Sequence, residues 1–264
     1  MSIVPVRQVE MPGGRVVGAV ESGVLGGSPV LVFHPTPSSC LFVRQQADAA
    51  LRTGVHLIGF SRPGSGGSTM TSPGLRVVAG DALRVADAFR LDRFAVLGFS
   101  GGTPFAAATG ALFPDRVTAL GLCAAVAPWS EVADRGGGYD DELVGLLRAD
   151  ADALDAEWLT PVLAMGQAIT LRDALTGEDE RPSYDSPAFD HVAFGLPWDV
   201  DMGSVRAPTW IWQGTGDPVT PPAHAEWWQR KLAHAELVLR EGRGHLGTFE
   251  AHREEMLAVL RDAG

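Results

Sequence analysis

Short apolar runs alternate with longer amphipathic stretches along most of the 264 residues of this chain. Runs rich in Val, Leu, Ile and Phe predict β-strands, whereas apolar residues at helical spacing predict helices. The predicted strands cover residues 30–34, 55–60, 94–99, 117–126, 209–213 and 236–240. The predicted helices cover residues 41–53, 73–89, 103–113, 221–232 and 247–261. Apolar strands that alternate with helices are typical of a parallel sheet with helices on both faces, so the pattern predicts an α/β fold.

Two parts of the chain depart from this alternation. Residues 4–11 and 15–22 are both β-prone and are separated by Pro12-Gly13-Gly14, which predicts a hairpin. After residue 129 the strand pattern stops, and it resumes only after residue 197. The block between them has acidic helical stretches and a polar turn, at residues 140–148, 152–158 and 176–185. We therefore expect a core of residues 1–129 and 198–264, with residues 130–197 inserted as a helical segment.

The composition argues against several classes of function. The formal net charge is -11, and such a chain repels phosphate backbones and anionic membrane surfaces, so we expect no nucleic-acid and no membrane partner. No segment reaches the roughly 18 apolar residues of a membrane-spanning helix, and the first residues show no signal-peptide pattern. Cys40 and Cys123 lie in apolar surroundings and are predicted to be single buried thiols. A cytoplasmic protein is expected, and the sequence gives no indication of its oligomeric state.

A candidate nucleophile lies in Gly98-Phe99-Ser100-Gly101-Gly102, which matches the pattern G-x-S-x-G. The match follows a predicted strand and precedes a predicted helix that has Pro104 in its first turn. A nucleophile elbow needs this context, because its serine adopts a strained backbone and its small neighbours let strand and helix approach closely. The context predicts Ser100 as a nucleophile.

A serine hydroxyl is a poor nucleophile near neutral pH and needs a base that a third group holds in place. His245 follows the last predicted strand, and Asp217 follows the strand before it. Loops at the carboxyl ends of parallel strands converge at one edge of a sheet, so both side chains can meet Ser100 there. Turn chemistry alone would also explain Asp217, which lies in a Gly-Asp-Pro sequence. With His245 at the next strand exit, we favour Asp217 as the group that orients the histidine.

Five stretches together resemble the α/β-hydrolase superfamily, and in particular its small bacterial serine hydrolases with an inserted helical cap. They are residues 34–37 (His-Pro-Thr-Pro), 62–68 (Arg-Pro-Gly-Ser-Gly-Gly-Ser), 98–102, 214–217 and 244–245. The chain order of Ser100, Asp217 and His245 is also the one expected for that family. The resemblance covers the chain outside residues 130–197. It implies a mostly parallel, twisted sheet of about eight strands with helices on both faces, and a cap formed by residues 130–197.

The resemblance also implies an oxyanion hole made by the backbone N–H groups of Thr36 and Gly101. Two positions depart from the family pattern: Pro35 replaces the glycine of His-Gly-x-Pro, and Ser61 replaces an aspartate before Arg-Pro-Gly. Proline has no N–H, but the implied donor belongs to Thr36, which a following proline pushes toward an extended conformation. His34 is expected to hold this loop in shape through hydrogen bonds.

These residues predict a serine hydrolase that cleaves a small, partly hydrophobic carboxylic ester or related acyl substrate through an acyl-enzyme. Its pocket is expected to include His34, Phe42, Phe99, Trp129 and Leu246. Lactone or C–C bond hydrolysis, acyl transfer and perhydrolysis stay open, as does a binding protein without turnover, because fold alone does not separate them. No cofactor and no metal are expected. The glycine-rich residues 64–67 lack the Lys-Ser/Thr pair of a phosphate-binding loop.

Overall fold

The computed structural model describes residues 5–132 and 185–264, which form an eight-stranded sheet with strand order β1-β2-β4-β3-β5-β6-β7-β8. The strands are β1 (Arg7–Glu10), β2 (Val16–Gly23), β3 (Ser28–Phe33), β4 (Val55–Phe60), β5 (Phe94–Phe99), β6 (Val117–Cys123), β7 (Thr209–Gly214) and β8 (Ala235–Arg240). Strand β2 pairs antiparallel with β1 and with β4, and every other pairing is parallel. The predicted hairpin and the mostly parallel sheet are therefore confirmed.

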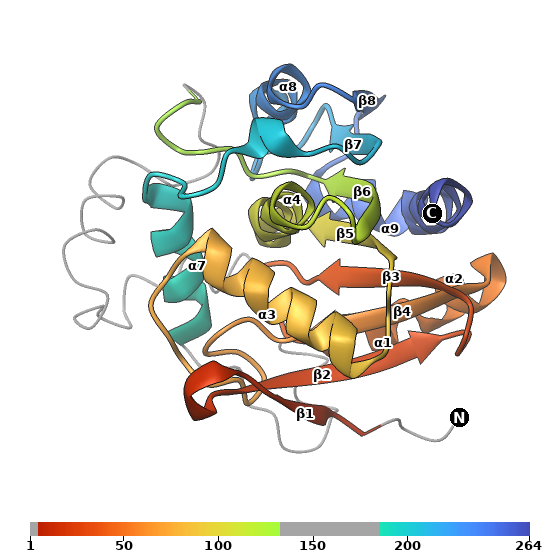
Figure 1. The fold of residues 1–264 in the computed structure, drawn as a ribbon. Helices are drawn as coiled ribbons and strands as arrows, with labels where there is room; N and C mark the ends of the chain where they lie inside the picture. The colour runs from red at the N-terminus through yellow and green to blue at the C-terminus, as the bar shows by residue number, and fades with distance from the viewer. Residues whose placement is uncertain (1–4, 133–184) are drawn as a thin grey trace.

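Helices cover both faces of the sheet, as Figure 1 shows. One face carries α3 (Leu75–Ala88), α4 (Thr103–Leu112) and α8 (Pro222–Lys231). The other face carries α1 (Phe42–Gln45), α2 (Ala47–Thr53) and α9 (His245–Ala263). Short 3-10 turns lie at η1 (Pro12–Gly14), η2 (Ser100–Gly102) and η3 (Met202–Ser204). The resulting three layers place a separate hydrophobic core on each side of the sheet.

Strand β5 explains why the central strands are apolar throughout. Phe94 and Val96 pack into the core with α3, α4 and α8, whereas Ala95, Leu97 and Phe99 pack into the core with α1, α2 and α9. Both sets are buried because successive side chains of a strand point to opposite faces of its sheet. Full burial of a large apolar side chain contributes about 1.5–3 kcal/mol, so β5 is a rigid platform for the residue that follows it.

Several element boundaries shift by one to three residues from the sequence prediction, and three differences have a clear local cause. The helix predicted at residues 41–53 is divided at Gln46, whose backbone (φ -97°, ψ 2°) is not helical. The strand predicted at residues 117–126 ends at Cys123, because the backbone of Ala124, with φ 49°, is no longer extended. Helix α9 begins at His245 rather than at residue 247, since Thr248 bonds to the Gly244 carbonyl through both its N–H and its hydroxyl. His245 is thus the first residue of a helix and not part of a loop.

Most of the expected insertion, including the stretches 140–148 and 152–158 and nearly all of the turn 176–185, lies outside the described residues. Its described end forms α7 (Asp185–Gly195), in which Phe189, Val192, Ala193 and Phe194 are buried. Figure 1 shows α7 at the side of the molecule where β3 ends. This is the edge of the sheet at which the candidate residues were expected to meet.

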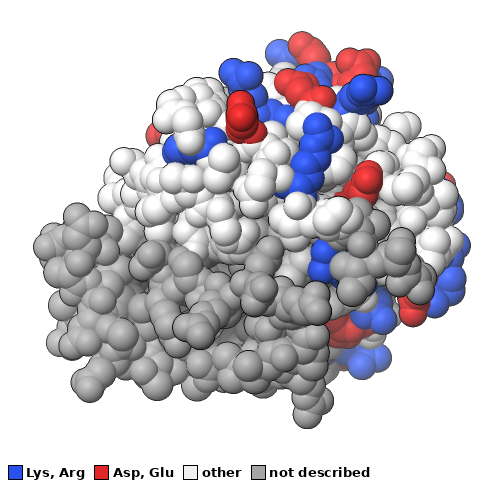
Figure 2. Space-filling model, turned by 90° about the horizontal axis from the view of Figure 1, so that it is seen from below, with Lys and Arg blue, Asp and Glu red and all other residues white. Residues whose placement is uncertain are grey.

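Charged side chains of both signs are interspersed on the face seen in Figure 2, and its described residues form no broad patch of one sign. None of the described helices is long and apolar enough to cross a bilayer. Cys40 and Cys123 are buried and are not joined in a disulfide, as predicted. Burial, with a smaller contribution from Asp217, raises the pKa of the Cys123 thiol well above its ordinary value. This thiol is therefore protonated near neutral pH and is a weak nucleophile.

Candidate active site

Ser100 lies directly after β5, at a sharp turn into η2 and α4. Its φ of 52° falls in the left-handed region, which is costly for a residue with a side chain and marks a strained turn. The neighbouring glycines leave the space that this turn needs. A Cβ at Gly98 would lie 2.8 Å from the Cβ of Ala106, and one at Gly102 would lie 2.2 Å from the Phe33 carbonyl oxygen. The close approach of β5, α4 and β3 thus fixes where the serine points.

The structure brings together the three residues expected to act in sequence. The Nε2 atom of His245 lies 2.8 Å from Ser100 Oγ, and its Nδ1 atom lies 2.8 Å from Asp217 Oδ2. A carboxylate can only accept, so Nδ1 carries the proton of the neutral ring and Nε2 is free to accept the serine proton. The three groups therefore have the connectivity that a general base and its orienting acid require.

Asp217 is held by more than the histidine. Its Oδ1 accepts the N–H groups of Val219 and Thr220 at 2.8 and 3.0 Å, and its Oδ2 also accepts the Thr220 hydroxyl at 2.9 Å. Burial raises the pKa of Asp217. The hydrogen bond and charge of His245, together with these two N–H groups, lower the same pKa by more, so it lies below the ordinary value. The carboxyl group is consequently ionised at neutral pH and fixed in direction.

Thr36 and Gly101 lie against each other beside Ser100. A Cβ added to Gly101 would be 2.1 Å from Thr36 Oγ1, so only glycine fits there without a shift. Among residues 5–132 and 185–264, no group accepts a hydrogen bond from the Thr36 N–H. Both positions border the cavity described below. Their placement is compatible with the oxyanion hole that the sequence resemblance implied.

His34 braces the loop after β3 and does not line the cavity. Its Nδ1–H donates to the Pro35 carbonyl at 2.8 Å, and its Nε2 accepts the backbone N–H of Arg62 at 3.2 Å. Burial, and to a lesser degree the Arg62 charge, lowers the pKa of His34 well below its ordinary value of 6.5. Both ring nitrogens thus hold the loop, which is the bracing role expected for His34. Neither nitrogen is available to contact a substrate, and, contrary to expectation, His34 does not belong to the cavity lining.

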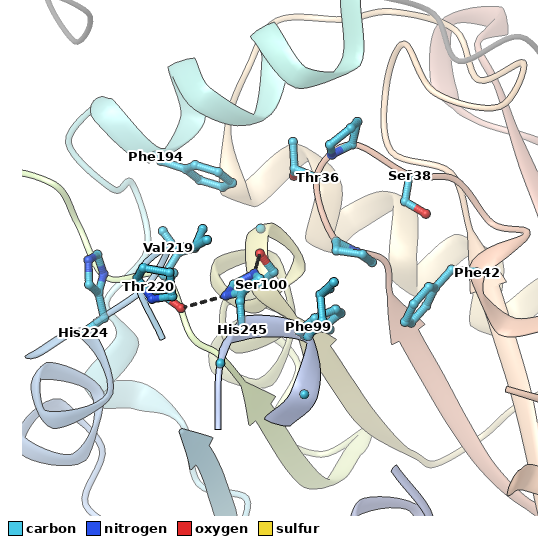
Figure 3. Close-up of a pocket in the computed structure, with 18 of the residues that line it drawn as sticks. Thr36, Ser38, Phe42, Phe99, Ser100, Phe194, Val219, Thr220, His224 and His245 are labelled. Atoms are coloured by element: carbon cyan, nitrogen blue, oxygen red, sulfur yellow. Dashed lines mark hydrogen bonds between the residues drawn. The ribbon is translucent and has the colours of Figure 1, made fainter. Parts of the chain in front are cut away.

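A cavity of about 570 Å³ opens over Ser100 and His245. The expected pocket residues Phe42, Phe99, Trp129 and Leu246 all border it. Figure 3 shows Phe194, Val219 and His224 on one side of the Ser100–His245 pair, and Ser38 and Phe42 on the other. Glu250 is the one Asp, Glu, Lys or Arg among the described lining residues, and its carboxylate pairs with Arg253 at 2.5 Å. The described walls are therefore mainly apolar on both sides of the serine.

The comparison with known proteins identifies the family. The model of the alpha/beta hydrolase fold family matches residues 28–251, which is most of the chain. This chain belongs to the α/β hydrolase fold family. The resemblance stated from the sequence and the fold class expected from it are confirmed.

Solved structures agree with this assignment. An esterase (EaEST) from Exiguobacterium antarcticum is 21% identical, with 98% of each chain covered and a TM-score of 0.74. A bromoperoxidase from Bacillus anthracis is 18% identical, with 97% of this chain and 98% of that chain covered and a TM-score of 0.74. An epoxide hydrolase mutant from Vigna radiata is 17% identical, with 100% and 99% covered and a TM-score of 0.71. At these identities the likeness to each shows the α/β hydrolase fold alone.

Sequence reasoning missed three residues around the site of this α/β hydrolase. Thr220 supports Asp217, while Arg62 and Asp190 form a fully buried ion pair behind Thr36. Arg62 lies in a stretch that the sequence analysis used only for the family resemblance. Asp190 could have been noticed because it lies between apolar residues of the stretch that forms α7. A carboxylate buried in such a stretch needs a charged partner. Among the described residues, no cluster of His, Cys, Asp and Glu could hold a metal ion.

Proposed function

We propose that this α/β hydrolase is a serine hydrolase that cleaves a carboxylic ester or a related acyl compound through an acyl-enzyme. The observation that supports the proposal most directly is the 2.8 Å contact between Ser100 Oγ and His245 Nε2. The opposite nitrogen of the same ring donates to Asp217. A serine that meets such a base at the end of a strained turn has the arrangement of an activated nucleophile.

In the proposed reaction, Ser100 Oγ attacks the carbonyl carbon of the substrate as His245 Nε2 takes the hydroxyl proton. The N–H groups of Thr36 and Gly101 hold the oxygen that becomes negative. Asp217 stabilises the imidazolium that forms. His245 then gives its proton to the leaving oxygen, and the acyl group stays on Ser100. Water attacks this ester with His245 as base again, which releases the acid and restores the serine.

The cavity supports a neutral substrate with apolar groups on both sides of the carbonyl. The walls on each side of Ser100 are mainly apolar, and the described lining has one carboxylate, at Glu250, to oppose an anionic group. The described walls of the cavity therefore suit a neutral acyl substrate better than one that carries negative charge.

We also propose that residues 130–197 are inserted between the core segments 1–129 and 198–264.

Ser100 disfavours the chemistry in which a carboxylate opens an epoxide, because a hydroxyl nucleophile gives a different covalent intermediate. Lactone hydrolysis, C–C bond hydrolysis, acyl transfer and perhydrolysis use the same first contacts and stay open at the level of the fold. A ligand-binding protein without turnover is the alternative of a different class. Whether Ser100 forms a covalent bond separates that alternative from all the others.

The test is covalent labelling with a fluorophosphonate, in which Ser100 Oγ bonds to phosphorus and fluoride leaves. The wild-type protein, Ser100→Ala and the control Ser72→Ala, which alters an exposed serine outside the cavity, are compared by intact mass and by turnover of short p-nitrophenyl esters. We expect one label on the wild type and on Ser72→Ala, and neither label nor turnover for Ser100→Ala. A folded wild-type protein that never labels, or a Ser100→Ala variant with full turnover, would refute the proposal.

A further inference from the structure

A fully buried ion pair joins Arg62, in the loop after β4, to Asp190 of α7. Both side chains have no exposed surface. Arg62 Nε donates to Asp190 Oδ1 at 2.8 Å, and Nη2 donates to Oδ2 at 2.5 Å. Two buried charges stabilise a fold no better than well-packed apolar residues of the same volume, so general stability does not account for the pair. What else these two residues contact indicates their role.

Arg62 also holds the loop that begins with His34. Nη1 donates to the His34 carbonyl at 2.5 Å, and Nη2 reaches the Pro35 carbonyl at 3.3 Å. The backbone N–H of Arg62 donates to the His34 ring. The guanidinium lies over the ring of Phe105 in α4, with its carbon 5.1 Å from the ring centre. Arg62 therefore links the loop to the helix that follows Ser100.

The Thr36 side chain closes the same network. Its hydroxyl accepts from Arg62 Nη2 at 3.0 Å and donates its single proton to Asp190 Oδ2. A hydroxyl bound on both its donor and its acceptor side is held in one rotamer. Asp190 and Thr36 are 154 positions apart in the chain, so the contact forms only when α7 is seated. The backbone of Thr36 is thereby fixed through its side chain.

We propose that Arg62 and Asp190 are positioning residues that aim the Thr36 N–H at the oxygen of the reacting carbonyl. The inference rests on the proposed function, because it concerns the oxyanion donor of that reaction. It goes beyond the proposed function because it makes the Thr36 N–H depend on the ion pair between the loop after β4 and α7 for its correct orientation. The seating of α7 and the assembly of the oxyanion hole are then a single event.

Two substitutions remove the clamp in different ways. Asp190→Asn keeps the size of the side chain but turns an amide NH₂ toward donors of Arg62 or Thr36. Thr36→Val keeps both charges and removes only the bridging hydroxyl, while Thr36→Ser restores that hydroxyl. The matched control is Asp81→Asn, because Asp81 accepts two hydrogen bonds from Arg15 at 3.0 and 2.7 Å and neither residue borders the cavity. The control thus breaks a comparable Arg–Asp pair outside the site.

The measurements are kcat and KM for a neutral p-nitrophenyl ester, and the inhibition constant of an alkyl boronic acid. The boronic acid adds to Ser100 and places a tetrahedral oxygen where the oxyanion would form. Misplacing a reacting group by about 1 Å costs roughly 10²-fold in rate, so we expect kcat to fall by about that factor in Asp190→Asn and Thr36→Val, with KM little changed. The boronic acid should bind more weakly by the same factor. Asp81→Asn should keep the wild-type values of both, and Thr36→Ser should recover most of what Thr36→Val loses.

The double variant Thr36→Val/Asp190→Asn should be no slower than either single variant, because both changes act on the same loop. The positioning role is overturned if folded Asp190→Asn matches Asp81→Asn in kcat and in boronic acid affinity. If Asp190→Asn does not fold, a Thr36→Val variant with wild-type kcat overturns it instead. A wild-type protein that is never labelled at Ser100 overturns the proposed function and this inference together, whereas labelled wild type with unaffected variants overturns only the inference.

Discussion

Replacing Gly101 by alanine tests the proposed oxyanion hole at its most crowded point. The new Cβ would lie 2.1 Å from Thr36 Oγ1, 2.8 Å from Thr36 Cβ and 3.2 Å from Phe194 Cζ. The φ of Gly101 lies outside the left-handed region, so alanine can adopt the backbone conformation. Lack of space is therefore the only obstacle to this substitution.

The size of the effect follows from these distances. An ordinary contact begins near 3.4 Å, so the Thr36 hydroxyl must move by 3.4 − 2.1 = 1.3 Å. Its hydrogen bonds to Arg62 and Asp190 prevent a simple rotation, so the loop itself has to shift. We expect kcat to fall by about 10²–10³-fold, because a shift of this size misplaces one donor and loses most of its contribution. The added methyl should also lower the free energy of unfolding by about 1–3 kcal/mol.

The assay compares Gly101→Ala with Gly110→Ala, a second glycine-to-alanine change within the following helix. A Cβ at Gly110 would lie 3.8 Å from atoms of Leu120 and Val205, so this control fits. It should keep the wild-type kcat and raise the free energy of unfolding by about 0.5–1 kcal/mol, since alanine is the better helix residue. Ester turnover and urea unfolding are measured on all three proteins. A Gly101→Ala variant as active as the control would refute the crowding argument and the placement of the oxyanion hole.

Three further predictions concern the base and the loop brace. Asp217→Asn should lower kcat by about 10⁴-fold, because an amide no longer selects the His245 tautomer that accepts the serine proton; steady-state kinetics and the labelling rate check this. Thr220→Val removes the hydroxyl that donates to Asp217 at 2.9 Å and should lower the free energy of unfolding by about 1–3 kcal/mol at neutral pH, as measured in urea. The pKa of His34 is depressed in the folded protein, so as the pH falls below about 6.5 the His34 ring takes up a proton in the unfolded chain only. Stability should thus decrease by up to about 1.4 kcal/mol per pH unit below that value, and His34→Gln should remove this part of the slope; equal slopes in the two proteins would contradict the assignment.

The sheet could be predicted because its signal is local. Each central strand is buried on both sides, so its sequence is apolar without interruption and its ends are marked by turn residues. The residues after those strands could be predicted to meet, since parallel strands bring their carboxyl ends to one edge. The same reasoning predicts that Ser100, Asp217 and His245 lie together, and the two 2.8 Å distances that join them agree.

The supports of the site could not be predicted in the same way. Arg62 and Asp190 are 128 positions apart, and neither belongs to a periodic pattern that points to the other. An ion pair of this kind depends on how a loop and a helix from distant parts of the chain are seated. The division of the helix at Gln46 and the early start of α9 were missed for a related reason. Local hydrogen bonds determine where those helices begin and end, and the spacing of apolar residues carries no information about these bonds.

Pro35 illustrates how the supports change the meaning of a single residue. In the sequence it replaces the family's glycine next to the proposed oxyanion donor, at a place where a missing N–H could matter. In the structure its carbonyl accepts hydrogen bonds from His34 Nδ1 at 2.8 Å and from Arg62 Nη2 at 3.3 Å. Pro35 thus stabilises the loop through its carbonyl oxygen, for which no N–H is needed. Proline also restricts the backbone. Arg62 donates hydrogen bonds to the carbonyls of His34 and Pro35 and to the Thr36 hydroxyl. A donor fixed in this way before substrate binds needs no reorganisation during the reaction, which is the condition under which oxyanion stabilisation lowers a barrier most. Pro35 therefore helps to hold the loop on which the proposed chemistry depends.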